Sequence, residues 1–184
     1  MMNDLKNIVL GVTGSIAAHK AIDLASLLTK SNCRVNVILS ADAEEFVKPL
    51  PFETLTRRPV VRSLYDRGEA PVLHINIADE ADILLIAPAT ANTIAKLACG
   101  LADDPLSCTA LALKPETPVL IAPAMNGKMW NHPATQSNVS ILSNRGVEFI
   151  GPDEGMLSCG YEGVGRIWPV EGISERALQV LNCL

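Results

Sequence analysis

Four short runs of apolar residues alternate with longer stretches of helical periodicity, and this alternation limits the folds open to the chain. The runs lie at residues 8–12, 35–39, 83–87 and 119–122. Apart from Asn36, every residue of these runs is apolar or glycine, and the runs do not alternate regularly with polar residues, as in strands that are buried on both faces. The sequence therefore predicts an α/β fold of three layers, with a Rossmann-like or flavodoxin-like parallel sheet and helices on both of its faces.

The other segments complete the expected order. Helices are predicted at residues 16–30, 44–48, 105–113, 133–144 and 173–184, one more helix begins within 88–93 and runs to about 98, and a strand is predicted at 147–150. The segment 151–165 has five glycines in fifteen residues. We expect it to be a mobile loop without secondary structure that acts as a lid.

The composition narrows the class of protein and its partners. The 184 residues fit one domain, 1–184, and carry a net charge of −5. That charge argues against nucleic acid or an anionic membrane as the main partner, and no apolar run approaches the roughly 18 residues of a membrane span. The N-terminus has no targeting pattern, and the five cysteines include no C-x-x-C pair. We therefore expect a cytoplasmic protein with reduced thiols and no metal site.

A glycine turn follows the first predicted strand. Gly14, Ser15 and Ile16 lead from it into a helix, where free backbone N–H groups bind anions, most naturally a phosphate. A turn that simply joins strand to helix explains these residues nearly as well. Ser40 ends the second strand, where a dinucleotide fold often has an acidic residue for a ribose hydroxyl. This favours a mononucleotide, although Asp42 keeps a dinucleotide open.

Polar residues also follow the third and fourth strands. The third strand is followed by Thr90, Ala91, Asn92 and Thr93. A helix cap requires only one of their side chains, so three polar groups in four residues favour a ligand. The fourth strand ends at Pro123. By spacing alone, the residues that follow are slightly better explained as an ordinary strand-to-helix loop, whose large side chains cover the core, than as a ligand-binding loop. The carboxyl ends of parallel strands share one edge, so all these segments can surround one crevice.

The sequence PAMNGKMW at residues 123–130 resembles the P-x-M-N-x-x-M-W motif of the flavin-dependent cysteine decarboxylases. Three more segments agree with that family: HINI at 74–77, APATANT at 87–93 and CGYEGVGR at 159–166. The resemblance covers nearly the whole chain. Asp104 stands where the family usually has asparagine, and Tyr161 stands where aspartate is frequent.

The resemblance implies FMN as the cofactor and assigns site residues by position. The residues implied to hold FMN are Gly14, Ser15, Ile16, Ser40, Thr90, Ala91, Asn92, Thr93 and Ala124. His74 would act as acid or base, and Cys159 would donate the last proton to the product. Asn126 would bind the substrate carboxylate. The other implied substrate contacts are Met125, Gly160 and Arg166.

The implied substrate is phosphopantothenoylcysteine, an intermediate of coenzyme A biosynthesis, and the implied product is phosphopantetheine. FMN would take an electron pair from the CH₂–SH group, giving a thioaldehyde that loses CO₂, and would return the pair to the resulting enethiol. Family members assemble from trimers with the flavin near the interface, so we expect a homo-oligomer. An aromatic content of 4% agrees with a flavin pocket that a second copy completes.

Three other interpretations stay open at this stage. A peptidyl-cysteine decarboxylase shares the histidine and the P-x-M-N motif, but many of these enzymes lack the lid cysteine, so Cys159 favours the coenzyme A enzyme. A flavin prenyltransferase lacks the P-x-M-N…W motif. A non-catalytic FMN-binding regulatory protein would lack catalytic positions, whereas His74, Asn126 and Cys159 are all present. We expect no fused synthetase domain, because the sequence ends at residue 184.

Overall fold

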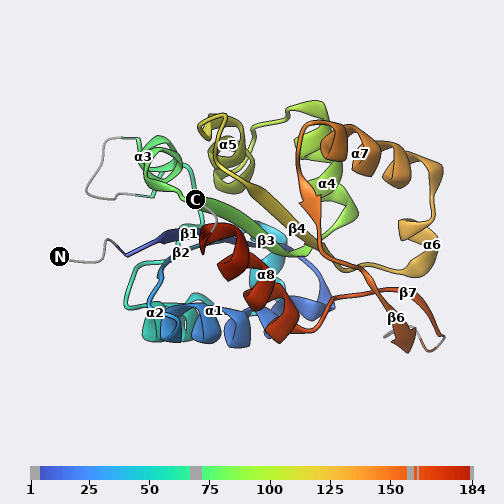
Figure 1. Ribbon diagram of the computed structural model, residues 1–184, viewed down its shortest axis with the longest axis horizontal. Helices are drawn as coiled ribbons and strands as arrows, with labels where there is room; N and C mark the ends of the chain where they lie inside the picture. Colours follow the sequence, from blue (N-terminus) through green and yellow to red (C-terminus); the bar gives the residue numbers. More distant parts are fainter. Residues whose placement is uncertain (1–4, 67–71, 157–159, 161, 183–184) are drawn as a thin grey trace.

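Five parallel strands form the central sheet of the computed structural model, which describes residues 5–66, 72–156, 160 and 162–182. In spatial order they are β2 (Arg34–Leu39), β1 (Asn7–Val12), β3 (Ile83–Ala89), β4 (Val119–Pro123) and β5 (Glu148–Phe149). This order, 2-1-3-4-5, is that of flavodoxin-like folds. The predicted fold class is therefore confirmed (Figure 1).

Helices cover both faces of the sheet (Figure 1). One face carries α1 (Lys20–Lys30), α2 (Pro49–Thr56) and α8 (Val170–Asn182). The other face carries α3 (Leu73–Glu80), α4 (Ala91–Cys99), α5 (Pro105–Ala112) and α7 (Pro133–Asn144). Three short segments, η1 (Ile16–His19), η2 (Ala41–Glu45) and α6 (Gly127–Trp130), follow β1, β2 and β4. No helix within the described residues has the length and apolar character needed to cross a membrane.

The core lies in two layers, one on each side of the sheet. Successive residues of β1 enter different layers: Ile8 and Leu10 share a cluster with Leu24 of α1, whereas Val9 shares one with Ile94 of α4. All five side chains are fully buried. A strand that buries both faces has no polar face, which is why its sequence is a continuous apolar run.

Thr13 joins the carboxyl ends of β1 and β3. Its hydroxyl donates to the carbonyl oxygen of Pro88 at 2.8 Å and accepts from the backbone N–H of Thr90 at 3.0 Å. From these two strands the chain runs to opposite faces of the sheet, through α1 on one side and α4 on the other (Figure 1). Neighbouring strands whose connections depart in this way leave a crevice between them, the usual ligand position in open α/β sheets.

The predicted helix at 44–48 is wrong. The chain there forms η2, then an extended residue at Lys48, and α2 begins at Pro49. Proline fixes φ near the helical value, and a helix needs no hydrogen-bond donor in its first turn. Pro49 therefore starts a helix at a place where the sequence suggested an interruption.

The glycine-rich segment 151–165 also differs from the prediction. It contains β6 (Asp153–Met156) and β7 (Glu162–Arg166), which pair antiparallel, so the expected loop without secondary structure is wrong. Arg166 forms an ion pair with Asp153 across this hairpin. The guanidinium group of Arg166 lies over Gly155, where a Cβ would come within 3.1 Å of it. Glycine at this position leaves room for the ion pair.

Asp104, which stands where the family usually has asparagine, caps helix α5 and so has a structural role. Its carboxylate accepts hydrogen bonds from the backbone N–H of Ser107 at 2.8 Å and from Nζ of Lys96 at 2.7 Å. Partial burial acts to raise the pKa of Asp104, but the hydrogen bonds from Lys96 and Ser107 outweigh it and lower the pKa below its usual value.

Replacing Asp104 with asparagine should change how stability depends on pH. Because the pKa of Asp104 is lowered by folding, its carboxylate stabilises the protein above the unfolded value of 3.8, and this contribution disappears as the pH falls through the folded value. Urea unfolding should show Asp104→Asn to be less stable by roughly 0.5–1 kcal/mol at neutral pH, with the difference shrinking below about pH 4. The matched control Asp79→Asn removes an exposed carboxylate that makes no hydrogen bond among the described residues, and should match the wild type. A constant deficit of Asp104→Asn down to pH 2.5 would contradict the assignment.

Candidate active site

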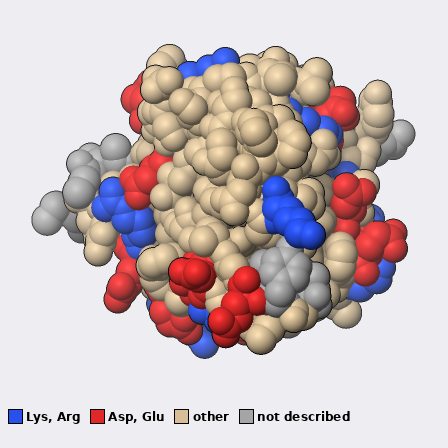
Figure 2. All heavy atoms as spheres, turned by 90° about the vertical axis from the view of Figure 1, so that its right-hand side faces the viewer, with Lys and Arg blue, Asp and Glu red and all other residues tan. Residues whose placement is uncertain are grey.

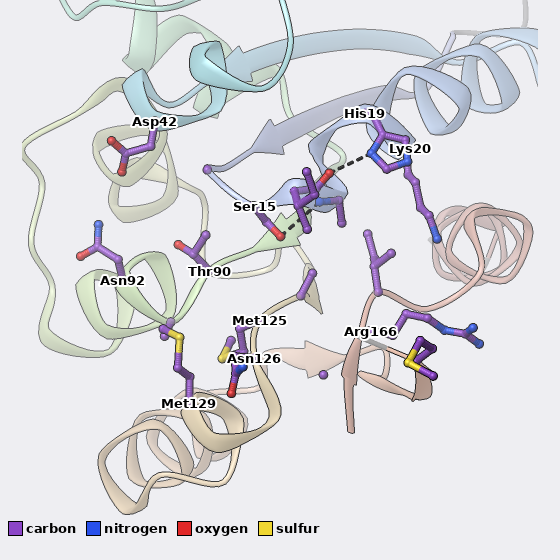
Figure 3. A pocket seen from close by; sticks show the side chains of 18 residues that line it. Ser15, His19, Lys20, Asp42, Thr90, Asn92, Met125, Asn126, Met129 and Arg166 are labelled. Carbon is purple, nitrogen blue, oxygen red and sulfur yellow. Dashed lines mark hydrogen bonds between the residues drawn. The ribbon is translucent and has the colours of Figure 1, made fainter. Parts of the chain in front are cut away.

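A cavity of about 550 Å³ lies at the carboxyl ends of β1, β3 and β4, a volume typical of cofactor and substrate sites. Its wall is made of residues that follow different strands (Figure 3). They are Gly14, Ser15, Ile16, Ala17, His19 and Lys20 after β1; Asp42 after β2; Thr90, Ala91 and Asn92 after β3; Ala124, Met125, Asn126 and Met129 after β4; and Met156, Gly165, Arg166 and Ile167 from the hairpin and the residue after it.

The glycine turn after β1 is part of this wall and requires glycine for a close approach. A Cβ on Gly14 would lie 2.3 Å from the Cβ of Asp42 and 3.0 Å from its backbone carbon. Glycine therefore lets η2 close over the turn and brings Asp42 to the cavity. The hydroxyl of Ser15 accepts from the backbone N–H of Ala17 at 3.3 Å and caps η1.

The segment after β3 divides its polar groups between a helix cap and the cavity. The hydroxyl of Thr90 accepts from the backbone N–H of Thr93 at 3.2 Å, and the two hydroxyl groups are 3.1 Å apart. Thr93 is thus engaged with Thr90 and does not line the cavity, whereas Asn92 is exposed and does (Figure 3). The helix cap is thus observed, whereas ligand binding by Asn92 stays a prediction.

Asn126 lies at the start of α6 and faces the cavity. The backbone N–H of Ala124 donates a hydrogen bond to the carbonyl oxygen of Ala89 at 3.0 Å. This bond connects the chain after β4 to the end of β3. Oδ1 of Asn126 accepts from the backbone N–H of Lys128 at 2.8 Å and caps α6. One end of the amide is thereby held by the helix, so its orientation is set before a ligand binds.

The β6–β7 hairpin is attached directly to this asparagine loop. The backbone N–H of Met125 donates to the carbonyl oxygen of Gly165 at 2.9 Å. A Cβ on Gly165, whose φ is +145°, would lie 2.2 Å from the carbonyl oxygen of Met125. This contact places Arg166 in the cavity wall. The hydrogen bond from Arg166 holds the pKa of Asp153 below its usual value.

Some residues implied by the resemblance lie away from the cavity wall. Ser40 caps η2 by accepting from the backbone N–H of Ala43 at 3.2 Å, and Gly160 is exposed. His74 is half-buried on α3 and does not line the cavity. Figure 1 shows α3 at the left of the molecule, whereas α6, β6 and β7 lie at the right. Cys159 falls outside the described residues.

The sequence analysis missed several residues of the wall. The cavity is also lined by Lys20, Asp42, Met129 and Met156. Thr13 does not line it but holds the strand ends that do, through its hydrogen bond to Pro88. Lys20 comes five residues after Ser15, so a cation close in sequence to the glycine turn was a usable signal. Asp42 was considered only as a ribose ligand, and Met156 had no signal because its hairpin was not predicted.

The composition of the wall fits a flavin mononucleotide. Hydroxyl, amide and backbone groups lie at the β1 and β3 ends, where flavodoxin-like folds bind FMN. Met125, Met129 and Met156 offer polarizable thioethers, which pack well against aromatic rings. Within the described part of the chain, no Phe, Tyr or Trp lines the cavity, so any aromatic stacking on the flavin must come from elsewhere.

Residues 1–182 match the Flavoprotein family, and the chain belongs to this family. This confirms the assignment made from the motifs.

Two curated relatives show how far the similarity extends. The probable phosphopantothenoylcysteine decarboxylase of Streptococcus mutans is 42% identical over 172 residues, which are 93% of this chain and 96% of that protein. The coenzyme A biosynthesis bifunctional protein CoaBC of Bacillus subtilis is 45% identical over 178 residues, which are 96% of this chain but 43% of that protein. The chain thus spans nearly all of the first relative and less than half of the second.

Solved structures share the fold over almost the whole chain. A PPC decarboxylase mutant with cysteine replaced by serine, complexed with pantothenoylaminoethenethiol, has a TM-score of 0.86 at 30% identity and covers 97% of this chain and 99% of its own. The FMN binding protein AtHal3 has a TM-score of 0.84 at 30% identity, covering 97% of this chain and 98% of its own.

Replacing Gly14 with alanine should reduce flavin binding, because the added Cβ pushes η2 away from the cavity. We expect purified Gly14→Ala to retain roughly tenfold less flavin per chain than the wild type, measured by visible absorbance. The control is Gly100→Ala, at φ +70° with no atom within 4 Å of the added Cβ. That control should lose roughly 1 kcal/mol of stability but keep its flavin. Full flavin content in Gly14→Ala would show that the turn does not contact the cofactor.

Proposed function

We propose that this chain catalyses the FMN-dependent decarboxylation of 4′-phospho-N-pantothenoylcysteine to 4′-phosphopantetheine, a step of coenzyme A biosynthesis. The observation that carries the proposal is the cavity at the β1–β3 crevice with Asn126 of the P-x-M-N motif in its wall. The relatives named for this decarboxylation and for FMN binding support it. Residues 1–184 act as one flavoprotein domain in this proposal, and the reaction takes place in the cytoplasm.

Loss of CO₂ from a cysteine carboxylate needs a temporary acceptor for an electron pair, and bound FMN supplies one. Oxidation of the substrate CH₂–SH group to a thioaldehyde places a C=S group two bonds from the carboxylate. When the C–CO₂ bond breaks, its electron pair moves towards this sulfur and leaves an enethiol. The pair removed in the first step is returned to the enethiol, so no net oxidation occurs.

The residues of the wall bind and orient the substrate for this chemistry. The Asn126 side chain donates a hydrogen bond to the substrate carboxylate while its Oδ1 stays on the helix cap. Neutral amide donors hold a carboxylate without the strong stabilisation that a cation would give to the charged ground state. Met125 and Arg166 contact the remainder of the substrate from the cavity wall, and Gly160, which lies outside this wall, contacts it as the resemblance implies.

Cys159 protonates the enethiol carbon in the last step of the proposed sequence. A thiol suits this role because its proton is more acidic than that of the serine hydroxyl. Serine therefore cannot replace Cys159 in this step. The relative solved with pantothenoylaminoethenethiol is a cysteine-to-serine mutant, and an enethiol is the species expected when this step fails.

His74 reaches the cavity from a second copy of the chain in this proposal. It does not line the cavity of its own chain, and its neighbours Val72 and Ile75 are 49% and 41% exposed. The cavity rim also exposes apolar side chains, with Ile16 at 57% and Met129 at 50%. Contact between one rim and the α3 of the next copy is head-to-tail, and such contacts form a ring when the rotation between copies closes; the ring proposed here is the trimer that the family resemblance implies.

The surface agrees with this contact. Figure 2 views the molecule from the side on which α6, β6 and β7 lie, and the central and upper part of this face consists largely of uncharged residues. Exposed apolar side chains that gather on a surface mark interfaces, and Ile16, Met129 and Met156 at the cavity are of this kind. Because the cavity opens among residues of this kind, a second copy would both cover the cavity and exclude water from it.

The reaction itself tests the proposal. FMN-loaded protein incubated with phosphopantothenoylcysteine should release CO₂ and form phosphopantetheine, followed by product mass. Cys159→Ser should release CO₂ but accumulate the enethiol, two mass units lighter than the saturated product. Cys33→Ser, a change at a free cysteine on the α1–β2 turn, serves as the control and should behave as the wild type. If the wild type decarboxylates only peptides with a C-terminal cysteine, the protein is instead a peptidyl-cysteine decarboxylase. If it decarboxylates neither substrate, it is a non-catalytic FMN-binding protein.

Mixing two inactive variants tests the shared site. His74→Asn should lose roughly 10²- to 10⁴-fold in kcat as an acid–base variant, and Asn126→Asp should repel the substrate carboxylate while preserving the α6 cap. Co-expressed in equal amounts, the two should regain about one quarter of wild-type activity, because that share of interfaces joins an intact His74 to an intact Asn126. Assemblies purified separately and assayed together without exchange are the control. An inactive mixture would place both residues in a site within one chain.

A further inference from the structure

A second cavity of about 380 Å³ adjoins the first. It lies between the start of α1, the chain that leaves β7 and the start of α8. The two cavities share one wall, formed by His19, Lys20, Arg166 and Ile167. A long ligand in the first cavity can therefore extend past this wall into the second.

Positive charge is concentrated in the shared wall. Among the described residues that line either cavity, the lysine and arginine side chains are those of Lys20 and Arg166, and both line both cavities. The carboxylates lie away from the shared wall: Asp42 lines only the first cavity, and Asp23 and Glu171 line only the second. An anion at the junction thus meets Lys20 and Arg166, of which Arg166 is already paired with the carboxylate of Asp153.

Of these two cations, Lys20 is the one that is not held in an ion pair with a described residue. Arg166 is engaged in its ion pair with Asp153. Lys20 is half-buried, and its side chain makes no hydrogen bond or ion pair with any other residue that the structure describes, although after Arg166 its charge contributes to lowering the pKa of Asp153. Figure 3 shows the Lys20 and Arg166 side chains on one side of the cavity and Asn92 and Met129 on the other.

The proposed substrate has two anionic ends, a cysteine carboxylate and a phosphate, joined by a long amide chain. With the carboxylate at Asn126, the chain can run along the first cavity to the wall that it shares with the second. We propose that the phosphate end of the substrate binds where the two cavities meet, with Lys20 as its main contact and Arg166 as the second cation. This inference rests on the proposed function and adds to it the group that distinguishes the phosphorylated substrate from the unphosphorylated one.

Calorimetric titration of the FMN-loaded protein tests the junction with two probes, phosphopantetheine and pantetheine, which differ only in the phosphate. The wild type should bind phosphopantetheine roughly 10- to 100-fold more tightly, as one hydrogen bond between charged groups predicts. Lys20→Gln should bring the two affinities close together without changing the affinity for pantetheine or the flavin content. Lys20→Arg should keep the preference, and Lys30→Gln, at the exposed far end of α1, should match the wild type.

Three results would overturn the assignment. Equal affinities in the wild type would show that the junction does not recognise a phosphate. Loss of FMN in Lys20→Gln would assign Lys20 to the cofactor phosphate, and an equal loss for both probes would assign it to the pantetheine chain. If the wild type released no CO₂ from phosphopantothenoylcysteine, the proposed function would fail, while the two affinities would still decide whether the junction binds a phosphate.

Discussion

The joining of β1 to β3 at their carboxyl ends is the constraint on which the whole site depends. Thr13 makes this joint with a buried hydroxyl that is both donor and acceptor across the two strands. The hydrogen bond from Ala124 to Ala89 extends the same arrangement to β4. Because these loops are bonded to one another and not to a ligand, their side chains are positioned in advance for binding. The apolar strands supply the rigid base, and the crevice follows from the opposite departures of α1 and α4.

A second connection links the loop after β4, which carries Asn126, to the β6–β7 hairpin. The hairpin is bonded to the asparagine loop through Met125 and Gly165, and only glycine fits this approach. The next residue along, Arg166, is thereby brought to the wall between the two cavities. A short backbone contact therefore positions both Asn126, the proposed carboxylate ligand, and Arg166, one of the two cations proposed for the phosphate end. The proposed roles of Asn126 and Arg166 depend on this single attachment.

Much of the fold could be predicted because the burial of a strand on one or both faces determines the pattern of apolar residues in its sequence. Strands with two buried faces have no polar positions, and their carboxyl ends share an edge, so the segments after β1, β3 and β4 were expected together. The prediction failed where long-range pairing decides the structure. Glycines in 151–165 suggested an unstructured loop, but Asp153 and Arg166 pair across thirteen positions to make a hairpin. A helix was predicted at 44–48, but α2 begins only at Pro49, whose position in the first turn makes it a helix start.

The sequence by itself determined the fold class, the family and the strand ends at which polar groups gather, because periodicity and motifs are local properties. The tertiary structure decided which of those groups reach the cavity. Ser40 and Thr93 carry the same hydroxyl as Thr90, yet they are held at helix starts, while Thr90 also lines the cavity. It also placed His74 away from the cavity of its own chain and gathered Lys20 and Arg166 at one wall. A side chain's residue type sets what it can bond, but only the packed neighbours decide which partner it has.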